Sequence, residues 1–161
     1  MASTTAAQAR PAFAIKLLVA GLVAGIVMAM WQMMVEAFGG NGFWSPSVYI
    51  AATLLRNLQS VAMPVPFDFV SVMVGLMGHM MNSVIFGLIF TFLIGARFHS
   101  LVGQVVAGLI YGVVIFLVMQ LIFVPILDPV MLRLNTIAFL IAHMMFGVVL
   151  GALNYLLTRS K

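Results

Sequence analysis

Four long apolar stretches run through this 161-residue sequence and constrain its fold more than any other feature. They cover about residues 13–38, 69–96, 101–124 and 134–157, and each meets or exceeds the roughly 20 residues that a helix needs to cross a bilayer. A segment in lipid must satisfy its own backbone hydrogen bonds, and the alternating pattern of barrel strands is missing. The sequence therefore predicts an all-α integral membrane protein with four transmembrane helices.

The composition agrees with lipid as the solvent. Hydrophobic residues make up 65% of the chain and charged residues only 6%, against about 25% charged residues in soluble domains. The net charge of +4 comes from cations scattered among apolar stretches, which argues against nucleic acid as a partner. The chain has no cysteine, so disulfides, iron–sulfur ligation and thiol nucleophiles are excluded.

Capping residues mark the predicted helix ends. Asp68 and Ser100 are predicted N-caps of the second and third helices, and Gly95 a C-terminal cap of the second. Asp128, followed by Pro129, is predicted to open the fourth helix.

A longer connection joins the first two spans. Ser45 and Pro46 resemble a helix start, and apolar residues then alternate with polar ones. We predict a short interfacial helix over about residues 46–59, with Trp44 and Tyr49 as anchors at the membrane surface.

The basic residues near the helix ends predict the orientation, because Lys and Arg are retained on the cytoplasmic side during insertion. One side carries Arg10, Lys16, Arg97, Arg159 and Lys161, and the other carries Arg56 and Arg133 with all three acids, Glu36, Asp68 and Asp128. Both termini are therefore predicted to be cytoplasmic. The first apolar run is too long for a signal-peptide core, which favours an uncleaved helix in a bacterial inner membrane.

Two segments of the sequence resemble each other. Residues 78–87 align with residues 142–151 through a shared His-Met-Met triplet, and residues 20–25 align with residues 107–112. This pattern predicts two pseudo-repeated hairpins related by a twofold axis along the membrane normal. Chance similarity between apolar helices is the competing explanation.

Pairs of small residues four positions apart recur in the predicted helices. They are Gly21 with Gly25, Gly108 with Gly112, Gly147 with Gly151, and Ser83 with Gly87. Such pairs allow helix backbones to approach closely in lipid. We expect most of them to pack helices within the chain and one to face a second chain.

His79 and His143 are the central candidate residues, since both are predicted to lie at similar depth in the central or outer part of the bilayer. The other polar residues predicted within or beside the spans are Gln32, Glu36, Asn82, Ser83 and Gln120. The neighbouring methionines are Met30, Met33, Met34, Met77, Met80, Met81, Met119, Met144 and Met145. In the simplest interpretation, each neutral histidine bonds to Gln32, Gln120, Asn82 or a carbonyl of a facing helix, and the methionines fill space.

Three further interpretations remain open. The two histidines could ligate haem b axially, or form a Cu(I) site with Met80 and Met144. In an oligomer, they could also carry protons along a polar seam that includes Glu36. Transport would favour broken helices, but the predicted spans contain no internal proline, which predicts unbroken ones.

The sequence contains no catalytic triad pattern, no HExxH motif and no glycine-rich phosphate loop. We therefore expect a non-enzymatic protein, acting as an accessory or structural subunit, or as a small homo-oligomer. Haem or copper binding and proton-linked transport are the alternatives.

Overall fold

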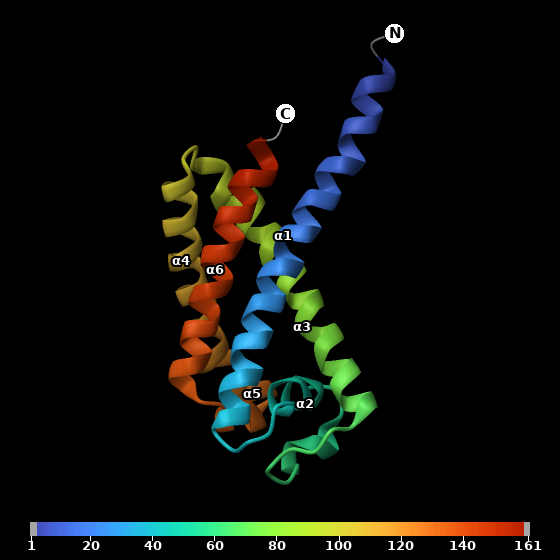
Figure 1. Cartoon of the computed structure of the whole chain (residues 1–161), viewed down its shortest axis with the longest axis vertical. Helices are drawn as coiled ribbons and strands as arrows, with labels where there is room; N and C mark the ends of the chain where they lie inside the picture. The colour runs from blue at the N-terminus through green and yellow to red at the C-terminus, as the bar shows by residue number, and fades with distance from the viewer. Residues whose placement is uncertain (1–2, 160–161) are drawn as a thin grey trace.

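The computed structural model describes the backbone of residues 3–159 and the side chains of residues 15–158. Every regular element in this part of the chain is helical, and four helices are long and apolar enough to cross a membrane (Figure 1). The long helices are α1 (Ser3–Phe38), α3 (Phe69–Ile89), α4 (Leu101–Val118) and α6 (Thr136–Arg159). The prediction of an all-helical fold with four candidate spans is confirmed.

Two of the candidate spans contain wider, π-helical turns. The helix of α3 continues through η2 (Phe90–Ile94) and η3 (Gly95–Arg97), and that of α4 through η4 (Met119–Phe123) and α5 (Val124–Leu127). Pro125 in α5 has no N–H and its ring would collide with the carbonyl of Leu121 in a regular helix, so the turn before it widens. The helices nevertheless continue without a break over Phe69–Arg97 and Leu101–Leu127, and Pro125 lies just beyond the predicted end of the third stretch.

Two predicted caps are confirmed by hydrogen bonds. A carboxylate oxygen of Asp68 accepts from the amide of Ser71 at 2.8 Å, and Ser100 Oγ accepts from the amide of Gly103 at 3.0 Å. The Ser71 hydroxyl also donates to Asp68. These two caps follow from residues three positions apart and need no tertiary contact.

The prediction that Asp128 caps the fourth helix is wrong. A short 3₁₀ helix, η5 (Pro129–Arg133), separates Asp128 from α6. Asn135 caps α6 instead, its Oδ1 accepting from the amide of Ala138 at 2.9 Å. Gly95 has a helical φ of −57° and does not form a left-handed cap; a Cβ there would lie 2.5 Å from Nδ2 of Asn154.

The connection between α1 and α3 forms two short elements, α2 (Ser45–Ala51) and η1 (Arg56–Ser60), instead of one helix over residues 46–59. A Cβ on Gly75 of α3 would lie 1.8 Å from the carbonyl oxygen of Ser47, so α2 packs directly against α3. Tyr49 of α2 is completely buried. The prediction that Tyr49 anchors the protein at the membrane surface is therefore wrong.

The long helices do not form an evenly packed bundle. Helix α6 packs against α1 and α4, and α1 packs against α3. Helix α3 inclines away from α4 toward the end of the molecule where α2 and α5 lie (Figure 1). We call this end, opposite to the start of α1 and the end of α6, the distal end.

Glycines bring the helices into backbone contact. A Cβ on Gly147 of α6 would lie 1.9 Å from the carbonyl oxygen of Gly108 in α4, and one on Gly108 would lie 2.1 Å from the carbonyl oxygen of Gly147. Helices α1 and α3 meet in the same way, since a Cβ on Gly21 would lie 2.8 Å from the carbonyl oxygen of Ser83. All four small-residue pairs thus pack helices within this chain.

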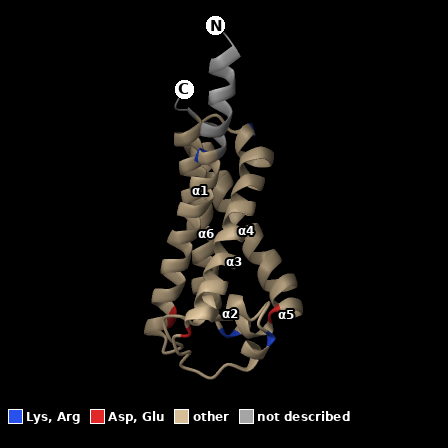
Figure 2. Cartoon of the chain, turned by 90° about the vertical axis from the view of Figure 1, so that its right-hand side faces the viewer, with Lys and Arg blue, Asp and Glu red and all other residues tan. Residues whose placement is uncertain are grey.

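The charged residues gather at the two ends of the molecule (Figure 2). All three acids lie at the distal end, where Glu36 ends α1, Asp68 precedes α3 and Asp128 follows α5. The predicted cytoplasmic cations Arg10, Arg159 and Lys161 lie outside the residues whose side chains are described.

Candidate functional site

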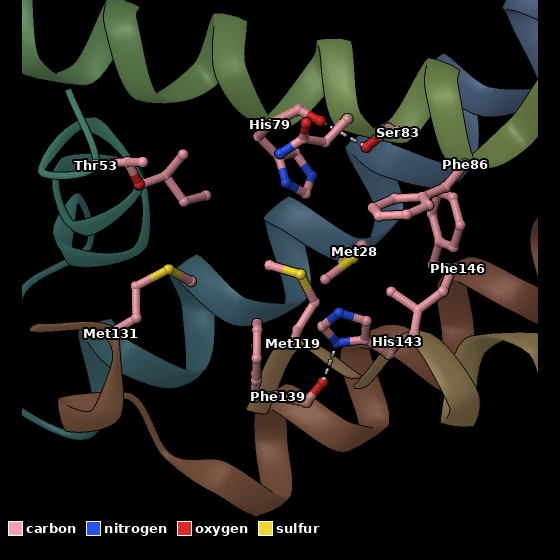
Figure 3. A pocket seen from close by; sticks show the side chains of 13 residues that line it. Met28, Thr53, His79, Ser83, Phe86, Met119, Met131, Phe139, His143 and Phe146 are labelled. Carbon is pink, nitrogen blue, oxygen red and sulfur yellow. Dashed lines mark hydrogen bonds between the residues drawn. The ribbon is translucent and has the colours of Figure 1, made fainter. Parts of the chain in front are cut away.

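The two predicted histidines lie in one cavity (Figure 3). His79 from α3 and His143 from α6 line a space of about 100 Å³. The rings of Phe86, Phe139 and Phe146 form much of the remaining wall. The site is therefore a small, aromatic-walled cavity between helices that are far apart in sequence.

His79 reaches across to helix α1. Its Nε2 atom lies 2.9 Å from the carbonyl oxygen of Gly25. A carbonyl oxygen only accepts hydrogen bonds, so Nε2 carries the proton of the neutral ring and Nδ1 carries the lone pair. This is the interhelical hydrogen bond that the simplest interpretation of the sequence expects.

His143 bonds within its own helix instead. Its Nδ1 atom lies 2.8 Å from the carbonyl oxygen of Phe139, one turn earlier, which leaves the lone pair on Nε2. The ring also packs edge to face against Phe139 and Phe116, with centroid distances of 4.4 and 5.9 Å. His143 is thereby held in one orientation on α6.

The predicted polar residues divide between the cavity and other places. Ser83 lines the cavity and donates to the carbonyl oxygen of His79 at 2.8 Å. Asn82 lines it with an exposed side chain. Gln32 shares a separate space of about 40 Å³ with His79, and Gln120 lies in η4 outside the cavities found among the described residues.

The methionines of the cavity differ from those proposed as metal ligands from the sequence. Met80 and Met144 do not line the cavity, although each directly follows one of the histidines. Its methionines are Met28 from α1, Met119 from η4 and Met131 from η5. Sequence analysis missed Met28 and Met131; the spacing of Met28 from Gln32, one helical turn, is a signal that could have placed it near the polar seam.

Glu36 belongs to a separate buried network. Its side chain is only 1% exposed, and its carboxylate accepts from Gln32 Nε2 at 2.8 Å, from the Asn135 amide at 2.9 Å and from Asn41 Nδ2. The network joins the end of α1 to the following loop and to the start of α6. Glu36 thus acts as a structural link at the distal end.

A second cavity of about 420 Å³ lies between α3 and α4 and shares six lining residues with the histidine cavity, including Asn82 and Met119. We call it the α3–α4 groove. Its wall includes five exposed apolar side chains, Ile89, Val114, Val118, Phe123 and Leu127. Tyr111 donates to the carbonyl oxygen of Phe86 at 2.9 Å and bridges the two sides. The groove therefore leads from the outer face of the helices to the histidines.

Polar residues close the distal end of the groove. The Asp128 carboxylate accepts from Thr53 Oγ1 at 2.8 Å and from Gln59 Nε2. Burial raises the pKa of the Asp128 carboxyl above its usual range, although these two hydrogen bonds and nearby Arg56 act in the opposite direction. Arg56 also donates to the carbonyl oxygen of Leu127 at 2.6 Å.

The geometry does not favour haem between the two histidines. Nε2 of His79 is engaged by Gly25, and a space of about 100 Å³ has room for several water-sized groups, at roughly 10–15 Å³ each, but not for a porphyrin. Among the residues with described side chains, no three His, Cys, Asp or Glu residues cluster as a metal site. Any metal held here by the two histidines would need further ligands of another residue type.

No protein-family model, curated protein or solved structure matches this chain. Over the described residues, the fold defines a class: an all-helical protein with four helices that are long and apolar enough to cross a membrane. The site adds a histidine-lined cavity that opens sideways between two of these helices.

Proposed function

We propose that this chain is a non-enzymatic, multi-pass membrane protein that binds an amphipathic, lipid-soluble molecule in the α3–α4 groove. It would act as an accessory subunit that holds this molecule within the bilayer. The observation that carries the proposal is the continuity of the groove, which runs from the outer face of two apolar helices to a cavity with polar groups.

The groove offers different chemistry along its length. Val114 and Val118 are 49% and 38% exposed, and they supply an apolar surface for a hydrocarbon chain. Asn82 lines both the groove and the histidine cavity with an exposed side chain, and an amide without a hydrogen-bond partner in lipid costs free energy. A ligand with an apolar chain and a carbonyl or hydroxyl group would match both features.

We expect Val118→Trp to block labelling of the protein by a photoactivatable, diazirine-bearing lipid, because the indole fills the groove. Leu117→Trp is the matched control, since Leu117 is exposed on the same helix but does not line the groove. Mass spectrometry of cross-linked peptides measures labelling at residues 82–89 and 111–118. Equal labelling of both variants would contradict the proposal.

The proposed orientation has both chain ends in the cytoplasm of a bacterium, with the four helices in its inner membrane. Lys16 and Arg97 near one end of the helices, and the three acids at the distal end, support it (Figure 2). The short elements α2 and η1 would then lie at the outer membrane surface, with α2 tucked against α3. Alkaline phosphatase fused after residue 161 should be inactive, and green fluorescent protein fused at the same position should be fluorescent. The reverse result would contradict this orientation.

We also propose that the two hairpins are pseudo-repeats. In support, Gly21 and Gly25 face Ser83 and Gly87 as Gly108 and Gly112 face Gly147 and Gly151. In this repeat α1 corresponds to α4 and α3 to α6. The α3–α4 groove departs from the symmetry, because α1 packs against α6 whereas α3 does not pack closely against α4. An experimental structure in which residues 15–97 do not superpose on residues 101–158 would contradict the repeat.

Proton-linked transport receives less support from the same geometry. All the predicted carriers would need to share one path, but Glu36 is held by Gln32, Asn41 and Asn135 at the distal end. The carboxylate thus has a structural role that a proton path would disturb.

A further inference from the structure

We propose that His79, His143, Met28 and Met119 form a binding site for one monovalent soft metal ion, Cu(I) or Ag(I), within the histidine cavity. This inference goes beyond the proposed lipid-binding function; of the four proposed ligands, only Met119 also lines the α3–α4 groove. The four side chains come from α3, α6, α1 and η4, so the site exists only in the folded chain.

The imidazole tautomers suit metal binding. Each ring donates one N–H to a backbone carbonyl, His79 to Gly25 and His143 to Phe139. The other nitrogen of each ring therefore carries a lone pair, and both rings line the same small space. A histidine that donates its second N–H to a carbonyl is the usual outer-shell arrangement of metal-binding histidines.

Two thioethers complete the donor set. In Figure 3 the sulfur atoms of Met28 and Met119 lie between the two imidazole rings. Met119 is in the π-helical turn η4, and π turns in helices occur frequently at functional sites. Thioether sulfur is a soft ligand that favours Cu(I) over Mg²⁺, Ca²⁺ or Mn²⁺.

The charge of the cavity selects for a monovalent ion. Neither a carboxylate nor a thiolate lines it, so the four donors are neutral and the bound ion keeps its full charge. The cost of moving an ion from water into an apolar medium rises with the square of its charge, which penalises Zn²⁺ and Cu(II) far more than Cu(I). The aromatic rings of Phe86, Phe139 and Phe146 also line the site.

The test is titration of the full chain, purified in detergent, with Cu(I) in competition with a chromophoric Cu(I) chelator, and with Ag(I) by calorimetry. We expect one ion per chain. Met28→Leu and Met119→Leu should each weaken binding about tenfold or more, the loss that even outer-shell changes cause in metal sites. Leucine retains the apolar volume, so the fold is preserved.

Met80→Leu and Met144→Leu are the matched controls, because these methionines adjoin the histidines in sequence but lie outside the cavity. They should bind Cu(I) as tightly as the unchanged chain, and X-ray absorption should show nitrogen and sulfur ligands. Absence of binding by the unchanged chain, or equal losses in the control variants, would overturn the site. Val118→Trp should retain the ion, so this proposal and the lipid proposal fail independently.

Discussion

Replacing Gly147 with alanine is expected to destabilise the protein strongly. The new Cβ would lie 1.9 Å from the carbonyl oxygen of Gly108, so α4 and α6 would have to separate. Backbone atoms cannot move aside as a side chain can, and we expect a loss of about 3 kcal/mol or more. The loss of stability is measured by heating the protein in detergent and using size-exclusion chromatography to determine the folded fraction at each temperature.

Gly78→Ala provides the control for helix propensity. Gly78 also lies inside a long helix, but its added Cβ would meet only a methyl group of Ile50 at the ordinary distance of 3.5 Å. Alanine is the better helix former, so this variant should be as stable as the unchanged protein or more stable. If the two variants unfold at the same temperature, the close α4–α6 contact is absent.

The contrast between these glycines shows what the sequence could predict about packing. The pair Gly147 and Gly151 marks a close helix contact in lipid, and the contact with Gly108 in α4 agrees with that expectation. The caps Asp68 and Ser100 were equally predictable, because each bonds to an amide three residues later. By contrast, Asp128 bonds to Thr53 and Gln59, about 70 residues away, and no local pattern indicates these partners.

The site could be predicted only in part, because the sequence does not show which face of each helix is directed toward the core. In a soluble protein an apolar stripe shows which face of a helix is buried. Here the core and the surroundings of the helices are both apolar, so the sequence cannot distinguish Met80, which lies outside the cavity, from Met28, which lines it. The histidines were identified because they are the rare polar residues at that depth. Their bonding partners, Gly25 and Phe139, are backbone carbonyls and carry no sequence signal.

The second large effect is expected from Glu36→Ala. The carboxylate is buried and accepts from Gln32, Asn41 and the Asn135 amide, so its removal leaves three donors without a partner. An unsatisfied buried donor costs about 1–3 kcal/mol, so we expect a loss on the order of 3 kcal/mol. Glu36→Gln keeps one acceptor oxygen and should fall between the alanine variant and the unchanged protein.

Asp68→Ala is the matched control, since it also removes a carboxylate from the distal end. Asp68 serves only the first turn of α3, through Ser71, and lies at the surface. Its loss should lower the unfolding temperature much less than the loss of Glu36, because water can take the place of the Asp68 carboxylate as the hydrogen-bond acceptor for the exposed first turn of α3. Hydrogen exchange should distinguish the two, with Glu36→Ala exposing amides at the end of α1 and the start of α6 together. Equal effects of the two substitutions would mean that the carboxylate of Glu36 does not join these helices.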